Sequence, residues 1–398
     1  MSIERKYDIC IIGGCGHVGL PLGIAFAKEG KKVVLYDINT DVISIVNKGN
    51  LPFKENGAEQ IMKEVVGSGN LVASNDTAVI SQSENVISVI GTPVDEHLNP
   101  RYQDVIAAMK EIEPFIDDDQ LLVLRSTLYP GVTEKVSEYL LSEGKKTNIA
   151  FCPERIAEGK ALTELYELPQ IISGVTESAV KRADKLFKNL AKKTVVLSPT
   201  EAELAKLFTN TWRYISFAIS NEFYEIAEQQ GHDFKAIYEA MTLDYPRLAA
   251  FARPGLAAGP CLFKDTMQLS AFSNNRFFLG HSAMLVNEGT PNFLVSQLKK
   301  TVDLSDKTIA VLGMAFKAEN DDPRESLSYK LRKVLSLEAK DVICSDEYIK
   351  DPTFVSAQEA INNADIIFIA TPHKAYATLD YKGKQVVDIW NHVNKEKK

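Results

Sequence analysis

The chain has 398 residues, of which 45% are hydrophobic and 25% charged, and its formal net charge is -8. This composition is typical of a globular protein with material for two or three domains, and it excludes a chain that is disordered along its length. The negative net charge offers no basic face for a phosphodiester backbone, so we expect no nucleic-acid partner.

The amino terminus passes from polar residues directly into a short apolar segment, without the longer hydrophobic core of a signal peptide. No later apolar run approaches the length of a membrane span. The five cysteines are an odd number without metal-type pairing, which argues against a disulfide framework and against a zinc site. We therefore predict a cytoplasmic protein with reduced thiols, no membrane partner and no bound metal.

Strand-like apolar segments alternate with helical ones up to about residue 200, which is typical of a doubly wound parallel sheet. The strand-like segments are YDICIIG, KVVLYD, NVISVIGTP, LLVLRST and NIAFCP. We predict a first α/β domain over residues 1–200.

The segment TEAELAKLFTNTWRYISFAISNEFYEIAEQQG keeps helical periodicity for about 29 residues and stops at Gly231, which predicts one long helix. Helical sequence continues to about residue 300, and KTIAVLGMAF, DVICSD, ADIIFIATP and QVVDIW then restore the α/β alternation. We predict a central helical domain over 201–300 and a second α/β domain over 301–398. The fold class is thus α/β, with two Rossmann-like doubly wound domains joined by the helical centre and a substrate cleft between them.

A glycine motif lies between the first predicted strand and the first predicted helix. Gly14, Gly16 and Gly19 form G-x-G-x-x-G, which permits a tight turn, close approach to a pyrophosphate and close helix packing. Asp37 ends the second predicted strand, 18 residues after Gly19, where an acid can bind the ribose hydroxyls and repel a 2′-phosphate. We predict an NAD site, with a purely structural turn and a solvated strand end as the alternatives.

The long predicted helix carries a cation and an amide on one face. Lys206 and Asn210 are spaced i, i+4, and Asn221 returns close to the same face. This arrangement can hold a negatively charged oxygen. The alternative is a snorkelling surface lysine next to an exposed amide.

A cysteine follows a Gly-Pro turn in the segment AAGPCLFKDT. Cys261 precedes Lys264 and Asp265 and is predicted at a helix N-terminus, where the dipole and a nearby lysine would lower its pKa. The alternative is a small buried side chain. We adopt that alternative for the other four cysteines, with Cys15 as a space-filling residue of the glycine turn: Cys10, Cys15, Cys152 and Cys344.

Together these motifs resemble the nucleotide-sugar 6-dehydrogenase family, which comprises UDP-glucose, UDP-N-acetylhexosamine and GDP-mannose dehydrogenases. The matching segments run in order along essentially the whole chain: GGCGHVGLPLG, GTPVD, RSTLYPGVTE, CPERIAEGKAL, AELAKLFTN, GPCLFKDT and GMAFKAENDDPRES. The resemblance implies oxidation of the sugar C6 hydroxyl to a carboxylate, with two NAD+ consumed at one site.

The resemblance also implies roles for the residues above. Cys261 would be the nucleophile that traps the aldehyde as a thiohemiacetal, and oxidation of that adduct would give a thioester that water hydrolyses. Lys206 and Asn210 would stabilise the developing oxyanions.

Further catalytic roles follow from the same resemblance. Glu154 matches the acid/base glutamate that assists thioester hydrolysis, and Thr127 and Asp265 match the residues that position the water. Glu158 matches a second glutamate nearer the nicotinamide. Without the family, the two glutamates are loop acids, Thr127 is a strand-end hydroxyl and Asp265 is a first-turn acid of a helix.

The remaining site predictions concern ligand contacts, and the resemblance to the family implies them. For the cofactor they are His17, Val18, Thr92, Thr127, Glu158 and Arg324. For the nucleotide sugar they are Glu154, Arg155, Lys206, Asn210, Gly255, Cys261, Phe316 and Lys317, with Arg247 reaching a neighbouring subunit's site. A homodimer or larger homo-oligomer built on the long helix is expected on this basis, although its apolar residues could equally form an intramolecular core.

Two segments depart from the common family pattern. Ala258, Gly259 and Pro260 precede the cysteine where many relatives have Gly-Gly-Ser or Gly-Gly-His. Trp390 stands where an arginine is often found, so the resemblance does not carry that arginine's contact with an anionic ligand over to this chain.

The substrate interpretation leaves alternatives. The segment CPER favours a UDP-N-acetylhexosamine, whereas IAEGKAL favours UDP-glucose, and GDP-mannose is third. A two-electron hydroxyacid dehydrogenase would share the cofactor motif but would not need Cys261. A non-catalytic protein that binds a nucleotide sugar or NAD is the other alternative.

Overall fold

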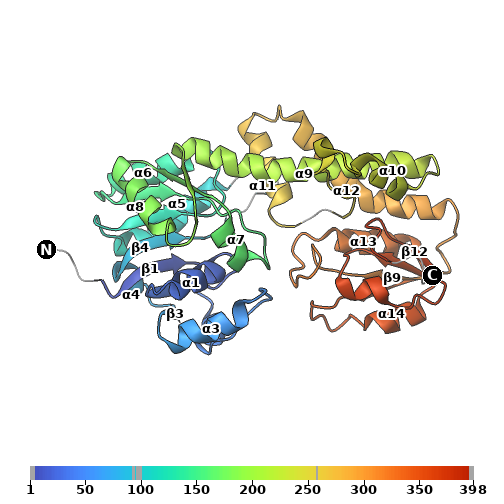
Figure 1. Cartoon of the computed structure of the whole chain (residues 1–398), viewed down its shortest axis with the longest axis horizontal. Coiled ribbons are helices and arrows are strands. Elements are labelled where there is room, and N and C mark those ends of the chain that lie inside the picture. The colour runs from blue at the N-terminus through green and yellow to red at the C-terminus, as the bar shows by residue number, and fades with distance from the viewer. Residues whose placement is uncertain (1–4, 92–94, 96–100, 257–258, 394–398) are drawn as a thin grey trace. The chain divides into compact units, whose positions relative to one another are not determined.

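The computed structural model describes residues 5–91, 95, 101–256 and 259–393. The chain folds as two compact units, residues 1–209 and 210–398 (Figure 1). This division into two units does not test the predicted division into three domains, which stays a prediction. None of the helices in the described ranges combines the length and the apolar character needed to cross a membrane.

The first unit is built on an eight-stranded sheet of order β3-β2-β1-β4-β5-β6-β7-β8. Its strands are β1 (Tyr7–Ile12), β2 (Val33–Tyr36), β3 (Leu71–Ser74), β4 (Ser83–Ser88), β5 (Leu121–Leu124), β6 (Asn148–Phe151), β7 (Gln170–Gly174) and β8 (Thr194–Val196). Neighbouring strands are parallel except for β6 and β7. The order of the first six is that of a dinucleotide-binding fold. The five strands predicted from the sequence are confirmed.

Helices cover both faces of this sheet. They are α1 (Gly19–Lys28), α2 (Thr40–Asn47), α3 (Ala58–Gly67), α4 (Ala78–Ser81), α5 (Tyr102–Ile112), α6 (Val132–Ser142), α7 (Ala161–Glu167) and α8 (Glu177–Phe187), with the short 3-10 helix η1 (Glu113–Phe115) after α5. Because side chains of a strand alternate between faces, Ile9 and Ile11 of β1 enter the core with α1, α3, α7 and α8, whereas Cys10 and Ile12 enter the core with α4, α5 and α6. Burial on both faces explains why these strands read as continuous apolar runs.

The long helix α9 spans Pro199–Gln229, 31 residues. Ser198 and Glu201 cap its start reciprocally: Glu201 accepts from the backbone N–H of Ser198 at 2.9 Å, and the Ser198 hydroxyl accepts from the N–H of Glu201 at 3.4 Å. Gly231, with φ of +76°, follows its end. The predicted length and stop are confirmed.

The second unit contains a four-stranded parallel sheet of order β10-β9-β11-β12. Its strands are β9 (Thr308–Leu312), β10 (Asp341–Ser345), β11 (Ile366–Ile369) and β12 (Gln385–Val387). Its helices after α9 are α10 (Phe234–Thr242), η2 (Pro246–Leu248), α11 (Leu262–Phe272), α12 (Phe278–Lys299), α13 (Leu327–Glu338), α14 (Ala357–Asn363) and η3 (Lys374–Thr378). Ile309 and Val311 of β9 face the core with α13, and Ala310 and Leu312 face the core with α14. The predicted second doubly wound sheet is therefore confirmed.

Candidate active site

The turn between β1 and α1 is shaped by its glycines. A Cβ on Gly14 would lie 2.8 Å from the Cβ of Leu35, and a Cβ on Gly19 would lie 2.7 Å from the Cα of Gly14, so neither position has room for a side chain. Gly16 differs, because the nearest atom to its Cβ position is the carbonyl oxygen of Gly13 at 3.7 Å. Two glycines thus permit the packing of the turn, and the third leaves open the surface that a pyrophosphate approaches.

Asp37 lies directly after β2, beside this turn. Its Oδ2 accepts the backbone N–H of Cys15 at 3.0 Å, and its Oδ1 accepts the N–H of Asn39 at 3.1 Å. The residue is half-buried. Each carboxylate oxygen can accept more than one hydrogen bond, so Asp37 keeps capacity for the two hydroxyls of a ribose. The residues present therefore fit a dinucleotide.

His17 and Val18 occupy the end of the turn, just before α1. The His17 ring stacks on Phe53, with ring centroids 4.0 Å apart and planes at 30°. Val18 is the N-cap residue of α1 and is half-buried. Thr92, also predicted to bind the cofactor, lies outside the described residues. Phe53 lies in the segment that follows α2, so this segment packs against the glycine turn through the His17 ring.

Glu154 is fixed by a buried arginine. Arg125 Nε donates to Glu154 Oε2 at 2.9 Å, and Nη2 of the same guanidinium donates to the same oxygen. Oε1 accepts the backbone N–H groups of Arg155 at 2.7 Å and Ile156 at 3.0 Å. The side chain of Arg125 is fully buried and also donates to Gln170 at 3.0 Å. These four contacts all come from donors, and together they fix the orientation of the Glu154 carboxyl group.

The other predicted residues of the first unit lie at the carboxyl edge of the sheet or in α9. Since Leu124 pairs with Phe151 in the β5–β6 register, Thr127 and Glu154 each follow the end of neighbouring strands by three residues. Thr127 and Glu158 are half-buried. Lys206 is 9% exposed, so the alternative of an exposed surface lysine is wrong.

Arg155 lies in the loop after β6. Its guanidinium donates to the backbone carbonyl of Pro169, which joins this loop to the start of β7. Partial burial lowers the pKa of Arg155, and neighbouring Glu154 opposes that change.

Cys261 lies at the N-terminus of α11, as predicted. It is the N-cap residue and is exposed, and its carbonyl oxygen accepts the N–H of Asp265 at 2.9 Å. The fully buried Asp265 carboxylate accepts a hydrogen bond from Asn210 Nδ2 at 2.6 Å and lies 3.6 Å from Lys264 Nζ. The structure thus brings together three of the predicted catalytic residues, Asn210, Cys261 and Asp265.

The other four cysteines are buried. Burial raises the pKa of the Cys15 and Cys152 thiols to about 12 and that of Cys344 to about 11, and it raises the pKa of Cys10 as well. These thiols stay protonated at neutral pH. Their interpretation as small buried side chains is confirmed.

Gly255 is held on two sides. The Asn221 side chain accepts the N–H of Gly255 at 2.8 Å and donates to its carbonyl oxygen at 3.0 Å. The ring of Trp390 lies on its α-carbon, since a Cβ there would be 2.1 Å from a ring carbon. Trp390 Nε1 donates to the carbonyl oxygen of Ala370 at 3.0 Å. The indole therefore fills space beside Gly255 and supplies no cation.

The segment before Cys261 also contacts the loop after β9. Gly259 has φ of +113°, and a Cβ there would lie 2.6 Å from the Phe316 ring, so this position requires glycine. Its N–H donates to the carbonyl oxygen of Glu325 at 3.4 Å. Pro260 is half-buried, and Ala258 lies outside the described residues.

Two predicted cations of the second unit lie on the loop after β9, and a third lies in the 3-10 helix η2. Lys317 Nζ lies 5.5 Å from the ring centroid of Phe316. Arg324 Nε donates to both carboxylate oxygens of the buried Asp322 at 2.9 Å. Arg247, in η2, is exposed.

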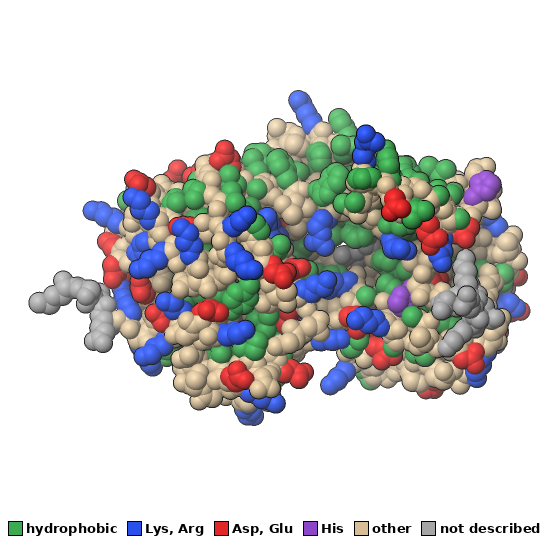
Figure 2. Space-filling model, viewed as in Figure 1, with side chains coloured by type: hydrophobic (Ala, Val, Ile, Leu, Met, Phe, Trp, Pro, Cys, Tyr) green, Lys and Arg blue, Asp and Glu red, His purple; other side chains and the backbone are tan. Residues whose placement is uncertain are grey.

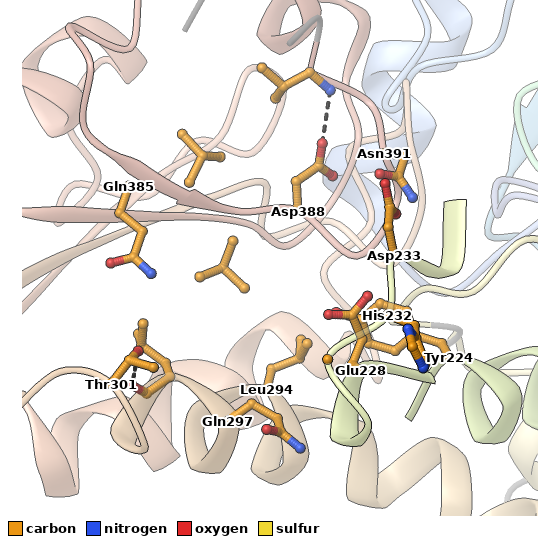
Figure 3. Close-up of a pocket in the computed structure, with 15 residues that line it drawn as sticks. Tyr224, Glu228, His232, Asp233, Leu294, Gln297, Thr301, Gln385, Asp388 and Asn391 are labelled. Atoms are coloured by element: carbon orange, nitrogen blue, oxygen red, sulfur yellow. Dashed lines mark hydrogen bonds between the residues drawn. The ribbon is translucent and has the colours of Figure 1, made fainter. Parts of the chain in front are cut away.

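A cavity of about 480 Å³ in the second unit lies at another place (Figure 3). The ends of α9 and α12 and residues around β12 line it, and its acidic side chains are Glu228, Asp233 and Asp388. None of its lining residues is a predicted site residue. Within the described parts of the chain, no cluster of three or more His, Cys, Asp or Glu side chains is arranged to hold a metal ion.

Three domain models of the UDP-glucose/GDP-mannose dehydrogenase family match the chain: the NAD binding domain over residues 7–191, the central domain over 200–288 and the UDP binding domain over 310–395. A UDP-N-acetyl-D-mannosamine dehydrogenase of Pyrococcus horikoshii is 33% identical over 93% of this chain and 90% of its own length. This chain belongs to the UDP-glucose/GDP-mannose dehydrogenase family. It is an NAD-dependent oxidoreductase of UDP-sugars.

Solved structures agree with this dehydrogenase assignment. A UDP-N-acetyl-D-mannosamine dehydrogenase from Pyrococcus horikoshii has a TM-score of 0.89 and 30% identity, covering 97% of this chain and 96% of that one. A UDP-glucose dehydrogenase from Pyrobaculum islandicum also has a TM-score of 0.89, with 26% identity and coverage of 98% and 96%. The predicted family, fold class and cofactor are confirmed.

Sequence reasoning missed two residues that contact Glu154 or its loop. Arg125 pairs with Glu154, and a charged residue at the end of the apolar segment LLVLRST was a signal for a buried partner. Glu55 binds the backbone of the loop that carries Glu154 and Glu158, and no sequence spacing indicates that contact.

Proposed function

We propose that the protein oxidises the C6 hydroxyl of a UDP-N-acetylhexosamine, most specifically UDP-N-acetyl-D-mannosamine, to the carboxylate. Three relatives that are 33%, 29% and 29% identical to this chain are named UDP-N-acetyl-D-mannosamine dehydrogenase, and each match covers at least 90% of the relative's length. Two molecules of NAD+ each accept one hydride in the overall four-electron oxidation.

The observation that carries this proposal is the contrast between Cys261 and the other thiols. Cys261 is exposed at the start of a helix, whereas the other four are buried and protonated. The positive end of a helix dipole favours a thiolate. A thiolate is required if the aldehyde of the first oxidation is to be kept on the enzyme and oxidised again.

The chemistry at Cys261 proceeds in three steps. The Cys261 sulfur forms a bond to C6 of the aldehyde, and the carbonyl oxygen takes a proton, giving a thiohemiacetal. Loss of a hydride from C6 and of the hydroxyl proton leaves a thioester. Water then adds to C6 and the C6–S bond breaks, which gives the carboxylic acid and regenerates the thiol.

Lys206 and Asn210 stabilise the negative oxygen on C6 in these steps, a contribution on the order of 3 kcal/mol for each donor. Asn210 Nδ2 carries two hydrogens and donates one of them to Asp265, which orients the amide. Asp265 and Thr127 position the water.

Glu154 serves as the base that takes a proton from this water. The contacts from Arg125 hold its carboxyl group in one orientation, as proton transfer from a positioned water requires. Four N–H donors already meet the two oxygens of Glu154, so the water takes the place of one of these donors at the carboxylate.

Ligand contacts complete the proposal. NAD is held by the turn residues with Asp37, Thr92, Thr127, Glu158 and Arg324. The nucleotide sugar contacts Arg155, Gly255, Phe316 and Lys317. The reaction depends on a reduced Cys261, so we place the protein in the cytoplasm, where thiols are kept reduced.

A homodimer or larger homo-oligomer is part of the proposal. Figure 2 shows apolar side chains gathered over the helices of the second unit. Exposed apolar residues follow one face of α9, and further ones lie on α12: Phe208, Trp212, Ile219, Phe223, Ile226, Phe278, Leu279 and Leu285. The exposed Arg247 is then available to a neighbouring subunit.

Trp212→Glu tests this interface, because it places a charge on the apolar face of α9. The variant is expected to have the mass of a monomer in light scattering after gel filtration. An unchanged mass would exclude this face as the subunit interface.

The stoichiometry of NADH per nucleotide sugar tests the reaction. UDP-N-acetylmannosamine, UDP-N-acetylglucosamine, UDP-glucose and GDP-mannose are supplied in turn, and absorbance is followed at 340 nm. Two NADH per UDP-N-acetylmannosamine are expected. Two NADH with UDP-glucose alone would instead favour the activity of the Pyrobaculum islandicum relative.

Cys261→Ala separates the remaining alternatives. The variant is expected not to form the second NADH per sugar, and the rate of its overall oxidation is expected to fall at least a thousandfold. One NADH per sugar in the unmodified protein would indicate a two-electron dehydrogenase. No NADH with any of the four sugars, together with measurable sugar binding, would indicate a non-catalytic binding protein.

A further inference from the structure

A short segment between α2 and α3 buries one carboxylate. The segment begins after Gly49, with φ of +75°, and ends at Gly57, with φ of +76°, so both ends turn sharply. Leu51 and Phe53 pack against the core of the first unit. Glu55 is 4% exposed, which is unusual for a glutamate and calls for specific partners.

The partners of Glu55 are backbone groups about a hundred residues away. Its Oε2 accepts the N–H of Gly159 at 2.9 Å, and its Oε1 accepts the N–H of Ala161 at 2.8 Å. The neighbouring Asn56 Nδ2 donates to the carbonyl oxygen of Gly159 at 2.8 Å. Gly159 has φ of +77°, and this left-handed turn is what lets both N–H groups meet one carboxylate.

These bonds hold the loop after β6, which carries Glu154 and Glu158. Glu154 accepts the N–H groups of the two residues that follow it, and Glu164 accepts the N–H of Ala157 at 2.6 Å. Three carboxylates thus fix a loop that is neither strand nor helix. Two of them belong to the loop and the helix after it, whereas Glu55 ties the loop to a different part of the unit.

The same segment also contacts the turn at the cofactor site. Phe53, two residues before Glu55, stacks on His17 with ring centroids 4.0 Å apart. One segment therefore contacts the glycine turn through an aromatic ring and the glutamate loop through a carboxylate.

We propose that Glu55 is a positioning residue for the oxidation, which holds the Glu154 loop in register with the cofactor turn through the segment 49–57. This inference rests on the proposed role of Glu154 in thioester hydrolysis. A charged acceptor is required, because two N–H donors converge on it and charge-assisted bonds of this kind are the strong ones.

Glu55→Gln tests the proposal, because it keeps the shape and replaces one acceptor oxygen with an NH2 group that faces a donor. Small misplacements of a catalytic group reduce rates steeply, so kcat per folded enzyme is expected to fall by about 10- to 100-fold. The KM for the UDP-sugar is expected to fall together with kcat, so that kcat/KM stays within about twofold, because the variant slows hydrolysis and this step follows both hydride transfers. Rapid mixing should also reveal a burst of up to two NADH per site, since slowed hydrolysis lets the thioester accumulate.

Thr176→Ala is the matched control. Thr176 caps α8 in the same unit by accepting the N–H of Ala179 at 3.1 Å, and it has no part in the proposed site. Its loss is expected to lower the melting temperature and to leave kcat and the burst unchanged.

The proposal is overturned if Glu55→Gln behaves like Thr176→Ala, with a lower melting temperature and unchanged kinetics. If Glu55→Gln does not fold, Asn56→Ala carries the test, because it removes the bond to the Gly159 carbonyl and should lower kcat several-fold with the same burst. Unchanged kinetics in that variant also overturn the proposal. Failure of the proposed function is a different result from failure of the Glu55 proposal, because in that case the unmodified protein itself would not form two NADH per sugar.

Discussion

The two sheets of the molecule begin with the same construction and use it differently. In each, the first strand ends at a glycine with positive φ, Gly13 or Gly313, whose N–H donates to the backbone carbonyl of the residue that ends the second strand. In each, an aspartate follows that second strand and accepts backbone N–H groups of the turn, Asp37 in the first sheet and Asp346 in the second.

The surroundings of the two aspartates differ. Asp37 is half-buried and accepts one N–H on each oxygen. The Asp346 side chain is fully buried, and besides the turn it accepts the N–H groups of Tyr348 and Ile349 and contacts the buried His373 at 3.2 Å. The same type of residue is therefore open to a ligand at Asp37, as we propose, whereas at Asp346 a histidine covers it and its contacts stabilise the fold.

The segments after the two turns differ accordingly. In the first sheet α1 begins at Gly19, the last glycine of the motif, so the N–H groups of its first turn are placed where a phosphate could accept from them. In the second sheet α13 begins only at Leu327, and the intervening loop carries Phe316, Lys317 and Arg324. The first turn presents a helix end to its ligand, whereas the second presents side chains.

Removal of the two carboxylates should give the largest difference between the sheets. Asp346→Ala leaves His373 and the backbone donors without their buried partner, so the free energy of unfolding of the second unit should fall by about 3–5 kcal/mol. Asp37→Ala should cost about 1 kcal/mol, because water reaches its donors. Urea titration of both variants measures this, and equal losses would contradict the comparison.

Substitution of the two turn glycines should give a smaller difference in the free energy of unfolding than substitution of the two aspartates. A Cβ on Gly313 would lie 2.5 Å from the carbonyl oxygen of Thr371, whereas the nearest atom to a Cβ on Gly13 is 3.6 Å away. Both Gly→Ala variants lose about 1 kcal/mol from the positive φ. Gly313→Ala should lose roughly 1–3 kcal/mol more from overpacking. Thermal melts compare them, and a Gly13→Ala variant with the lower stability would refute the argument.

Acid should weaken the second turn selectively. Burial alone would raise the pKa of Asp346, but hydrogen bonds from His373 and from the N–H groups of Ile349 and Tyr348 outweigh it and lower the pKa from 3.8 to about 2. A depressed pKa stabilises the fold above about pH 4, and this contribution of about 2 kcal/mol is lost as the pH falls towards 2. Urea titrations at pH 5 and pH 2.5 measure it, and Asp346→Asn should lack this part of the pH dependence.

The smallest predicted effect is on cofactor binding by the open turn. Asp37→Ala should raise the KM for NAD+ about tenfold, which corresponds to roughly 1.4 kcal/mol for a lost hydrogen bond to a charged group. The same variant should narrow the preference for NAD+ over NADP+, since the acid no longer repels a 2′-phosphate. Initial rates with both cofactors test this, and Asp346→Asn should leave the KM for NAD+ unchanged.

The sequence predicted what is local in the chain. The strands, the glycine turn, the length of α9 and the position of Cys261 at a helix start depend on residues within one or two turns of each other. The stabilising pairs were not predicted. Arg125 meets Glu154 and His373 meets Asp346 only because the sheets bring them together, and no periodicity encodes which buried charge finds which partner.

The same limit applies to the aspartates themselves. Asp37 and Asp346 both follow an apolar strand in the sequence, in KVVLYD and DVICSD. Only the structure separates them, because the residue that covers Asp346 lies 27 positions further along the chain.

The packing of Trp390 on Gly255 gives the protein a built-in optical probe. The chain has two tryptophans, and the other one, Trp212, is 65% exposed on α9. Trp212→Phe would therefore leave a single indole emitter, in contact with the segment that leads to Cys261. The wavelength and intensity of its fluorescence would then follow that segment in solution, without any attached dye.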